Sequence, residues 1–308
     1  MCKCILNREY YALKEIPKYK LFNYNRIFSN LKEPHILKKL ISYEFFPKII
    51  STFQDYDNIY LVTTYYEGKS LDYYREQTLT EEQLKFVSAC VIQSLIYLRK
   101  EKIIHRDIMM KNIIMDKNKY FNIIDFSFSI NYSDKKSKRN RMITYDMVTP
   151  PEILNRSDFD YNSDYYRLGS VIYYLIFKKY PYIIKQQYNI SDIFINHKLI
   201  KNYSYACIDF INNLLISDYQ KRIGYKDINE LKNHFWFKGF DWRKLVRKQI
   251  SSPFNIFKND SNQIDCTRFN ISMKTIIRYK LYSKNDLYLK LINQYNFVNM
   301  LILNKLYK

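Results

Sequence analysis

One short stretch, residues 103–127, constrains this chain more than any other. An apolar pair leads into His105-Arg106-Asp107, and after four further residues Asn112 opens a second β-rich segment. A polar turn and a third apolar segment follow, ending in Asp125-Phe126-Ser127. Two carboxylates and an amide are therefore expected at the ends of short paired strands. In such a set, one carboxylate can orient a hydroxyl while the other, with the amide, holds a metal ion on a polyphosphate.

This ordered set closely resembles the H-R-D-x-x-x-x-N catalytic loop and the D-F-G metal-binding loop of protein kinases. A lone H-R-D triplet is a weak signal, whereas the complete set is specific. The resemblance implies that Asp107 orients the incoming hydroxyl and accepts its proton. It also implies that Asn112 and Asp125 are the metal ligands and hold Mg²⁺ on ATP, so ATP and Mg²⁺ are the expected cofactors.

The resemblance covers residues 5–245 and implies an α+β, two-lobed protein kinase-like fold. A small lobe, a single antiparallel β-sheet with one helix, is expected over residues 1–66. A large, mostly helical lobe is expected over 67–243, followed by a C-terminal tail over 244–308. Residues 234–242 resemble the end of the catalytic domain in the AGC branch, which contains the cyclic-nucleotide-dependent kinases and protein kinase C.

Lys14 is the candidate for the lysine that neutralises the inner phosphates of ATP. It lies in a segment of strand-like alternation that resembles the V-A-I-K strand of kinases. Glu33 follows in a predicted amphipathic helix over residues 31–40, and in kinases a glutamate of that helix pairs with the strand lysine. Pro34 is expected to disturb this pairing, because proline inside a helix removes a hydrogen bond and kinks it.

The glycine-rich loop of kinases has no counterpart before Lys14. Met1 lies about where that loop should end, and none of the four glycines precedes Gly68. The backbone of this loop normally covers the phosphates. Two explanations stay open: the gene model is truncated at its N-terminus, or the protein lacks this lid.

The connection between the lobes is predicted from residues 44–69. Residues 44–66 have the pattern of a β-hairpin that turns at 55–58. By resemblance, Thr63 gates the adenine pocket and residues 67–69 form the hinge between the lobes. Thr80 and Gln83 then form a capping-box signature that opens a long helix reaching about residue 101.

The catalytic segment departs from the family at two positions. Met109 stands where serine/threonine kinases carry a lysine that steadies the transferred phosphate. Lys111 stands where tyrosine kinases place an arginine, which makes it a candidate catalytic residue that reaches the same phosphate. Ser127 replaces the glycine of D-F-G, a residue that allows backbone conformations which a Cβ resists.

Other parts of the resemblance are structural. Residues 150–152 resemble the A-P-E motif, whose glutamate, here Glu152, pairs in the family with an arginine that corresponds to Arg222. Asp164 corresponds to a buried aspartate in a central helix. The loss of one partner of a buried ion pair typically costs about 3–5 kcal/mol.

Charge and cysteine content exclude little but set the alternatives in order. The formal net charge of +20 suggests nucleic-acid binding, yet only residues 135–141 form a dense basic cluster. A solvated, lysine-rich surface is therefore preferred, and no nucleic-acid partner is expected. The five cysteines are odd in number and lack zinc-site spacing, which favours reduced thiols and a cytoplasmic or nuclear location. No signal peptide or membrane span is expected.

The predicted function is an ATP-dependent serine/threonine protein kinase, with a pseudokinase as the alternative. Retention of Lys14, Asp107, Asn112 and Asp125 favours the enzyme. The missing glycine-rich loop and the departures described above favour a weakly active or inactive binding module. In cyclic-nucleotide-dependent kinases, acidic side chains recognise arginine on protein substrates. Three of those acids fall on residues without an acidic side chain, which predicts a cleft that does not select basic peptides: Ser70, Lys111 and Tyr174.

Overall fold

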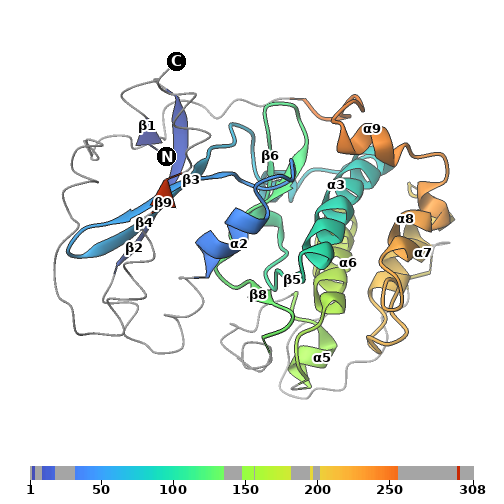
Figure 1. The fold of residues 1–308 in the computed structure, drawn as a ribbon. Helices are drawn as coiled ribbons and strands as arrows, with labels where there is room; N and C mark the ends of the chain where they lie inside the picture. Colours follow the sequence, from blue (N-terminus) through green and yellow to red (C-terminus); the bar gives the residue numbers. More distant parts are fainter. Residues whose placement is uncertain are drawn as a thin grey trace.

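The computed structural model describes residues 2–3, 9–17, 32–134, 148–155, 157–181, 195–196, 202–255 and 297–298. An antiparallel sheet with the short helix α2 lies to one side of the molecule, and the longer helices lie to the other (Figure 1). The predicted α+β, two-lobed fold is confirmed. No helix in the described part of the chain is long and apolar enough to cross a membrane.

The small lobe is built on a five-stranded sheet of strand order β1-β2-β4-β3-β9, in which every pairing is antiparallel. Its strands are β1 (Cys2–Lys3), β2 (Tyr10–Pro17), β3 (Ile49–Gln54), β4 (Asn58–Thr64) and β9 (Phe297–Val298). The hairpin predicted over residues 44–66 is present. Its turn forms because a carboxylate oxygen of Asp55 accepts the backbone N–H groups of Asp57 and Asn58, at 2.9 and 2.6 Å.

Strand β9 comes from the far end of the chain. It pairs with β3 and forms the edge of the sheet, with Val298 opposite Ser51 and Phe297 opposite Thr52 (Figure 1). The sheet that carries Lys14 therefore contains segments from both ends of the sequence. The other residues of the predicted tail beyond 255 lie outside the described part of the chain.

Helix α2 (Glu33–Lys39) begins two residues later than predicted. Lys32 is its N-cap, so Pro34 lies in the first turn, where backbone N–H groups have no partner within the helix. The expected kink at Pro34 was wrong for this reason. The buried side chains of Ile36 and Leu37 join the main hydrophobic core.

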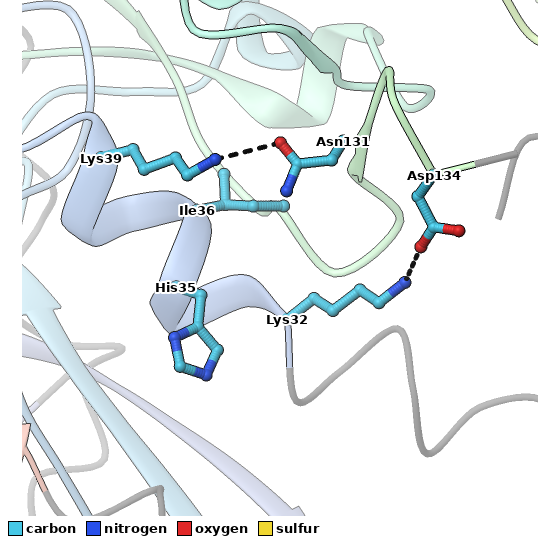
Figure 2. A pocket seen from close by; sticks show the side chains of 6 residues that line it. All are labelled: Lys32, His35, Ile36, Lys39, Asn131 and Asp134. Atoms are coloured by element: carbon cyan, nitrogen blue, oxygen red, sulfur yellow. Dashed lines mark hydrogen bonds and ion pairs between the residues drawn. The ribbon is translucent and has the colours of Figure 1, made fainter.

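The outer side of α2 is tied to the segment that follows strand β8 (Ile130–Asn131). Lys39 donates to Asn131 at 3.1 Å, and Lys32 forms an ion pair with Asp134 at 2.8 Å. Figure 2 shows both lysines extending from the helix across a cavity of about 230 Å³. These contacts join the helix that carries Glu33 to the large lobe.

The large lobe is organised around two buried helices, α3 (Glu81–Lys100) and α6 (Tyr161–Phe177). The predicted capping box opens α3: Thr80 accepts the Gln83 backbone N–H at 3.2 Å, and the Gln83 side chain accepts that of Thr80 at 2.9 Å. Further helices are α5 (Pro151–Leu154), α7 (Tyr205–Leu214), α8 (Asn229–Asn233) and α9 (Trp242–Val246).

Short strands and 3₁₀ turns line the cleft side of this lobe. They are η2 (Leu71–Tyr74), β5 (Ile103–Ile104), η3 (Met110–Asn112), β6 (Ile113–Met115) and β7 (Phe121–Ile123), with η5 (Phe235–Phe237) further along the chain. Strands β6 and β7 pair antiparallel, and β5 pairs with β8. This pairing brings the ends of the predicted catalytic and metal-binding loops together.

The predicted Glu152–Arg222 pair is present in the interior of the large lobe. Two guanidinium nitrogens of Arg222 each lie 2.8 Å from a different carboxylate oxygen of Glu152, and one also donates to the carbonyl of Asn162 at 2.7 Å. Both side chains of the pair are almost completely buried. This bidentate pair joins α5 to the start of α6 and to the segment before α8.

Candidate active site

The catalytic loop is held from below by Asp164 of α6. Its two carboxylate oxygens accept the backbone N–H groups of His105 and Arg106, each at 2.8 Å. Arg106 has a φ of 69°, a left-handed conformation that is costly for a residue with a side chain. The two buried hydrogen bonds stabilise this turn and so fix the position of the Asp107 backbone, which follows it.

The side chain of Asp107 is oriented by Asn112, a contact that the sequence analysis did not predict. The amide nitrogen of Asn112 donates to Asp107 Oδ2 at 2.7 Å and to the Asp107 carbonyl at 3.0 Å. Within the described residues the Asn112 side chain makes both of its hydrogen bonds through Nδ2, so Oδ1 stays available for another ligand. One amide thus orients the candidate base and keeps an oxygen for a metal ion.

A buried arginine that the sequence analysis did not single out lies beside Asp107. Arg167 of α6 is fully buried, and its Nη1 lies 4.0 Å from Asp107 Oδ1. Burial raises the pKa of Asp107 above its usual range, while the charges of Arg167 and Lys111 and the Asn112 hydrogen bond oppose that rise. The only signal in the sequence was a charged residue inside the mostly apolar run of residues 165–175.

Across the cleft, Lys14 of β2 joins two carboxylates from different elements. Its Nζ lies 2.8 Å from Glu33 Oε2 and 2.8 Å from Asp125 Oδ1. Glu33 also accepts the backbone N–H of Phe126 at 3.0 Å. The predicted Lys14–Glu33 pair therefore forms, and it connects β2, α2 and the loop after β7.

Charge distribution in this cluster follows from burial and pairing. Burial alone would lower the pKa of Lys14, but Glu33 and Asp125 outweigh it and raise that pKa above its ordinary value. Burial alone would raise the pKa of Asp125, yet Lys14 and Ser127 hold it at about 2. Lys14 and Asp125 are therefore both charged at neutral pH.

The loop that carries Asp125 differs from the expectation for Ser127. Asp125 has a φ of 63°, whereas Ser127 does not adopt a positive φ. The backbone conformation that favours glycine therefore falls on Asp125, and the expected difficulty with a Cβ at position 127 was wrong. The Ser127 hydroxyl instead donates to Asp125 Oδ1 at 2.6 Å.

A pocket of about 300 Å³ lies between the sheet of the small lobe and the β6–β7 hairpin. Lys14, Glu33 and Asp125 form its polar end, and Thr63, at the predicted gate position, also lines it. The remaining walls are mostly apolar, with side chains that include Ala12, Leu37, Leu61, Ile114 and Ile124. An apolar pocket with a few polar groups at one end suits a ligand with a flat ring and an anionic tail.

The hinge passes close to the floor of this pocket at Gly68. A Cβ at Gly68 would lie 2.5 Å from the carbonyl oxygen of Met115, which is closer than real Cβ atoms approach. The next residues bond to the same strand, because the Met115 N–H donates to the Lys69 carbonyl at 3.1 Å. Glycine is thus required at position 68 by this backbone approach.

Asn112 and Asp125 are the two residues that the motif assigns to a magnesium ion. Among the described residues, none donates to Asn112 Oδ1 or Asp125 Oδ2, so each side chain has an oxygen atom that could serve as a ligand. Mg²⁺ prefers oxygen ligands and usually binds through one or two carboxylates together with substrate phosphates. The predicted ligands match this pattern, and their role stays a prediction.

Lys111 and Tyr174 are two of the positions at which this chain departs from the pattern of its relatives. Lys111 is exposed in η3, and its ammonium forms no hydrogen bond with any described residue. Tyr174, where the arginine-directed relatives carry an acid, accepts a hydrogen bond from Arg75 at 3.0 Å. The Arg75 guanidinium also lies 5.4 Å from the centre of the Tyr174 ring. A cation therefore lies beside Tyr174.

Comparison with known proteins identifies relatives of this arrangement. The family model described as protein kinase domain matches residues 1–237. Serine/threonine-protein kinase Sgk1 of Gallus gallus is 27% identical over 267 residues, which cover 85% of this chain and 61% of the relative. Sgk1 of Rattus norvegicus is also 27% identical, with the same coverage, and sgk-1 of Caenorhabditis elegans is 27% identical over 252 residues, 80% of this chain and 54% of the relative. The chain spans about three fifths or less of the length of these curated relatives.

Proposed function

Because this chain belongs to the protein kinase family, we propose that it transfers the γ-phosphoryl group of ATP to serine or threonine hydroxyls of proteins. One observation carries the proposal: Lys14, Glu33 and Asp125 form a connected ionic cluster at one end of a pocket. The matches to Sgk1 proteins support serine and threonine as acceptors and agree with the AGC-type resemblance.

In the proposed mechanism, Asp107 accepts the proton of the incoming hydroxyl. Asn112 orients its Oδ2, and Arg167 lies beside Oδ1, so the carboxylate is held in one orientation before substrate binds. A positioned base of this kind contributes typically about 10²–10⁴-fold to the rate. Asp107 has only to orient the hydroxyl and accept its proton, because catalysis of phosphoryl transfer depends mainly on positioning.

The nucleotide is positioned by groups on the opposite side of the cleft. The apolar walls of the pocket bind the base, and the Lys14 ammonium, aimed by Glu33, neutralises the inner phosphates. Asn112 and Asp125 would hold Mg²⁺, which would supply charge neutralisation on the outer phosphates. Lys111 is exposed and its ammonium forms no hydrogen bond with a described residue, so it can approach the transferred phosphate in place of the lysine missing at Met109.

The substrate cleft is proposed not to select basic peptides. Lys111 and the Arg75–Tyr174 contact place cations where arginine-directed relatives have acids. A positional peptide library would test this directly. Strong selection of arginine before the acceptor hydroxyl would contradict the proposal.

A second candidate is a binding module that keeps the fold but transfers phosphate weakly. Met109 favours it, because a thioether cannot neutralise charge on the transferred phosphate. A single experiment distinguishes the two candidate functions. It measures phosphoryl transfer from labelled ATP and Mg²⁺ to a mixed protein substrate.

That experiment compares the wild-type chain with Asp107→Asn. The amide keeps the shape of the carboxylate but cannot accept the proton, so incorporation should fall by about 10²–10⁴-fold. Equal incorporation by both proteins would remove the kinase proposal and favour the binding module. Lys111→Met is the next variant, and a comparable loss would assign it to the transferred phosphate.

A further inference from the structure

Ser127 makes a contact that a glycine at its position could not make. Its hydroxyl donates to Asp125 Oδ1 at 2.6 Å, and its backbone N–H approaches the same oxygen at 3.3 Å. The serine is buried, so water does not easily replace the hydroxyl. A short hydrogen bond to a charged carboxylate is among the stronger kinds of hydrogen bond in proteins.

In the described part of the chain, the hydrogen bonds to the Asp125 carboxylate converge on one of its oxygens. Oδ1 receives Lys14 Nζ at 2.8 Å as well as both donors of Ser127. Among the described residues, none donates to Oδ2. The carboxylate is thus turned so that one oxygen is saturated by protein donors and the other is left for an added cation.

Local restraint matters here because the backbone of Asp125 is in the left-handed region, with a φ of 63°. This conformation costs roughly 1–2 kcal/mol for a residue with a Cβ. Lys14 alone would restrain the carboxylate from the other lobe, on a flexible side chain that also serves Glu33 and must reach the phosphates. Ser127 restrains it from within the same loop, whatever the position of the small lobe.

We propose that Ser127 is a positioning residue for the divalent cation: its hydroxyl holds Asp125 so that Oδ2 is presented to Mg²⁺. The inference rests on the proposed function, since it concerns the metal of that nucleotide site. Groups that orient metal ligands typically affect metal affinity by about 10–100-fold when removed. Ser127 therefore contributes to the site through its hydroxyl and is more than a tolerated replacement of the D-F-G glycine.

The test measures binding of a fluorescent ATP analogue to the full chain at a series of Mg²⁺ concentrations and in EDTA. Ser127→Ala removes the hydroxyl and keeps the Cβ. It should raise the Mg²⁺ concentration at half-maximal binding by about tenfold, with binding in EDTA unchanged. Ser127→Thr keeps a hydroxyl and should stay within about twofold of wild type.

Ser129 offers a matched control in the same loop. It is also buried, but its hydroxyl donates to the His105 carbonyl at 3.2 Å instead of a carboxylate. Ser129→Ala loses one buried hydroxyl bond of similar kind, and its Mg²⁺ dependence should stay that of wild type. If Ser127→Ala does not fold, Ser127→Gly compared with Ser127→Thr decides, and only the glycine variant should need more Mg²⁺.

Three results would overturn the inference: an unchanged Mg²⁺ midpoint in Ser127→Ala, an equal shift in Ser129→Ala, or nucleotide binding by the wild type that does not depend on Mg²⁺. The kinase proposal is tested separately, by the phosphoryl-transfer assay described above. A wild type that transfers phosphate while Ser127→Ala keeps its Mg²⁺ midpoint removes only the role of Ser127. A wild type that shows the Ser127-dependent midpoint but no transfer removes only the kinase activity.

Discussion

The catalytic loop and the Lys14 cluster face the same cleft, but they are held by different kinds of contact. Asp164 holds the catalytic loop through two backbone N–H groups inside the large lobe. The Lys14 cluster joins side chains from both lobes, and about a third of the Lys14 and Asp125 side chains is exposed. The geometry of the candidate base is therefore set by the folding of one lobe, whereas the geometry of Lys14, the candidate phosphate-binding cation, depends on how the two lobes meet.

This difference predicts that damage to the two regions has separate consequences. A defect in the buried contacts that hold the large lobe together, here called the buried framework, should appear first as lost stability, because uncompensated buried charge is costly. A defect in the Lys14 cluster should appear first as lost transfer.

The largest expected effect is on the buried framework, at the pair of Arg222 with Glu152. Arg222→Ala should lower the free energy of unfolding by about 3–5 kcal/mol, because Glu152 is left buried without its partner. Urea unfolding followed by circular dichroism measures the change. The double variant Arg222→Met with Glu152→Met removes both charges and should cost less than the single change. A loss below about 1 kcal/mol in Arg222→Ala would show that the framework is not held by this pair.

The second prediction concerns Lys14. Lys14→Met should lower the rate of phosphoryl transfer by about 10²–10³-fold, as expected when a preorganised donor is removed. Steady-state assays at saturating ATP measure it. Lys48→Met is the control. Lys48 donates to the carbonyls of Ile41 and Tyr43 in the segment that follows α2, so its replacement should leave transfer near that of wild type. An equal fall in both variants would mean that lobe packing, and not the phosphate contact, was lost.

The third prediction is a dependence of stability on pH that comes from His105. Burial lowers the pKa of His105 to about 4, so the folded protein keeps this histidine neutral while the unfolded chain protonates it near pH 6.5. At His105 the unfolded state therefore binds more protons between these values, so this residue should contribute a loss of stability of about 1–3 kcal/mol as the pH drops from 7 towards 4. The pKa of buried Asp164, raised to about 6, acts in the opposite sense, so the contribution of His105 is measured as a difference between wild type and variant.

Urea unfolding of the wild type and His105→Leu at pH 7 and pH 5 tests this. The variant should lose part of the decrease that the wild type shows. His35→Gln is the comparison, because His35 is exposed on α2 and its pKa is also lowered, by partial burial and by Lys38, so its change should alter the pH dependence less than His105→Leu does. Parallel curves for wild type and His105→Leu would contradict the prediction.

The smallest effect is expected at the outer face of α2. Lys39→Ala removes the exposed contact with Asn131 and should change the free energy of unfolding by less than about 1 kcal/mol. Transfer should fall by less than about threefold, since Glu33 remains positioned by Lys14 and Phe126. A loss comparable to that in Lys14→Met would show that the link in Figure 2 controls the position of Glu33.

The sequence predicted the parts of the site that lie close together along the chain. Residues 105–127 lie in one strand–turn–strand unit, so their spacing constrains their geometry directly. The pairing of Lys14 with Glu33 was predicted only through family resemblance, because nothing in the local pattern connects a strand to a helix nineteen residues away. Pro34 was misjudged because the start of the helix was placed two residues too early.

Two further features could not be predicted because they depend on packing between distant segments. Arg167 is a single charged residue in a mostly apolar run, and its place beside Asp107 is known only once α6 is packed against the catalytic loop. The sequence allowed Ser127 to be judged only as a replacement for the glycine of D-F-G. No sequence pattern indicates that its hydroxyl donates to the carboxylate two residues before it. The roles of the candidate site residues and the domain boundaries at 66 and 243 stay predictions.

Strand β9 has a consequence for the order in which the protein matures during synthesis. Chains emerge from the ribosome N-terminus first, and domains fold as units as they appear. The large lobe can assemble once residue 255 is exposed, but the sheet that carries Lys14 acquires its outer strand only after Phe297 and Val298 follow. The small lobe is therefore completed last, although its first strands are made first, and a nascent chain has Asp107 in place before the sheet that carries Lys14 is finished.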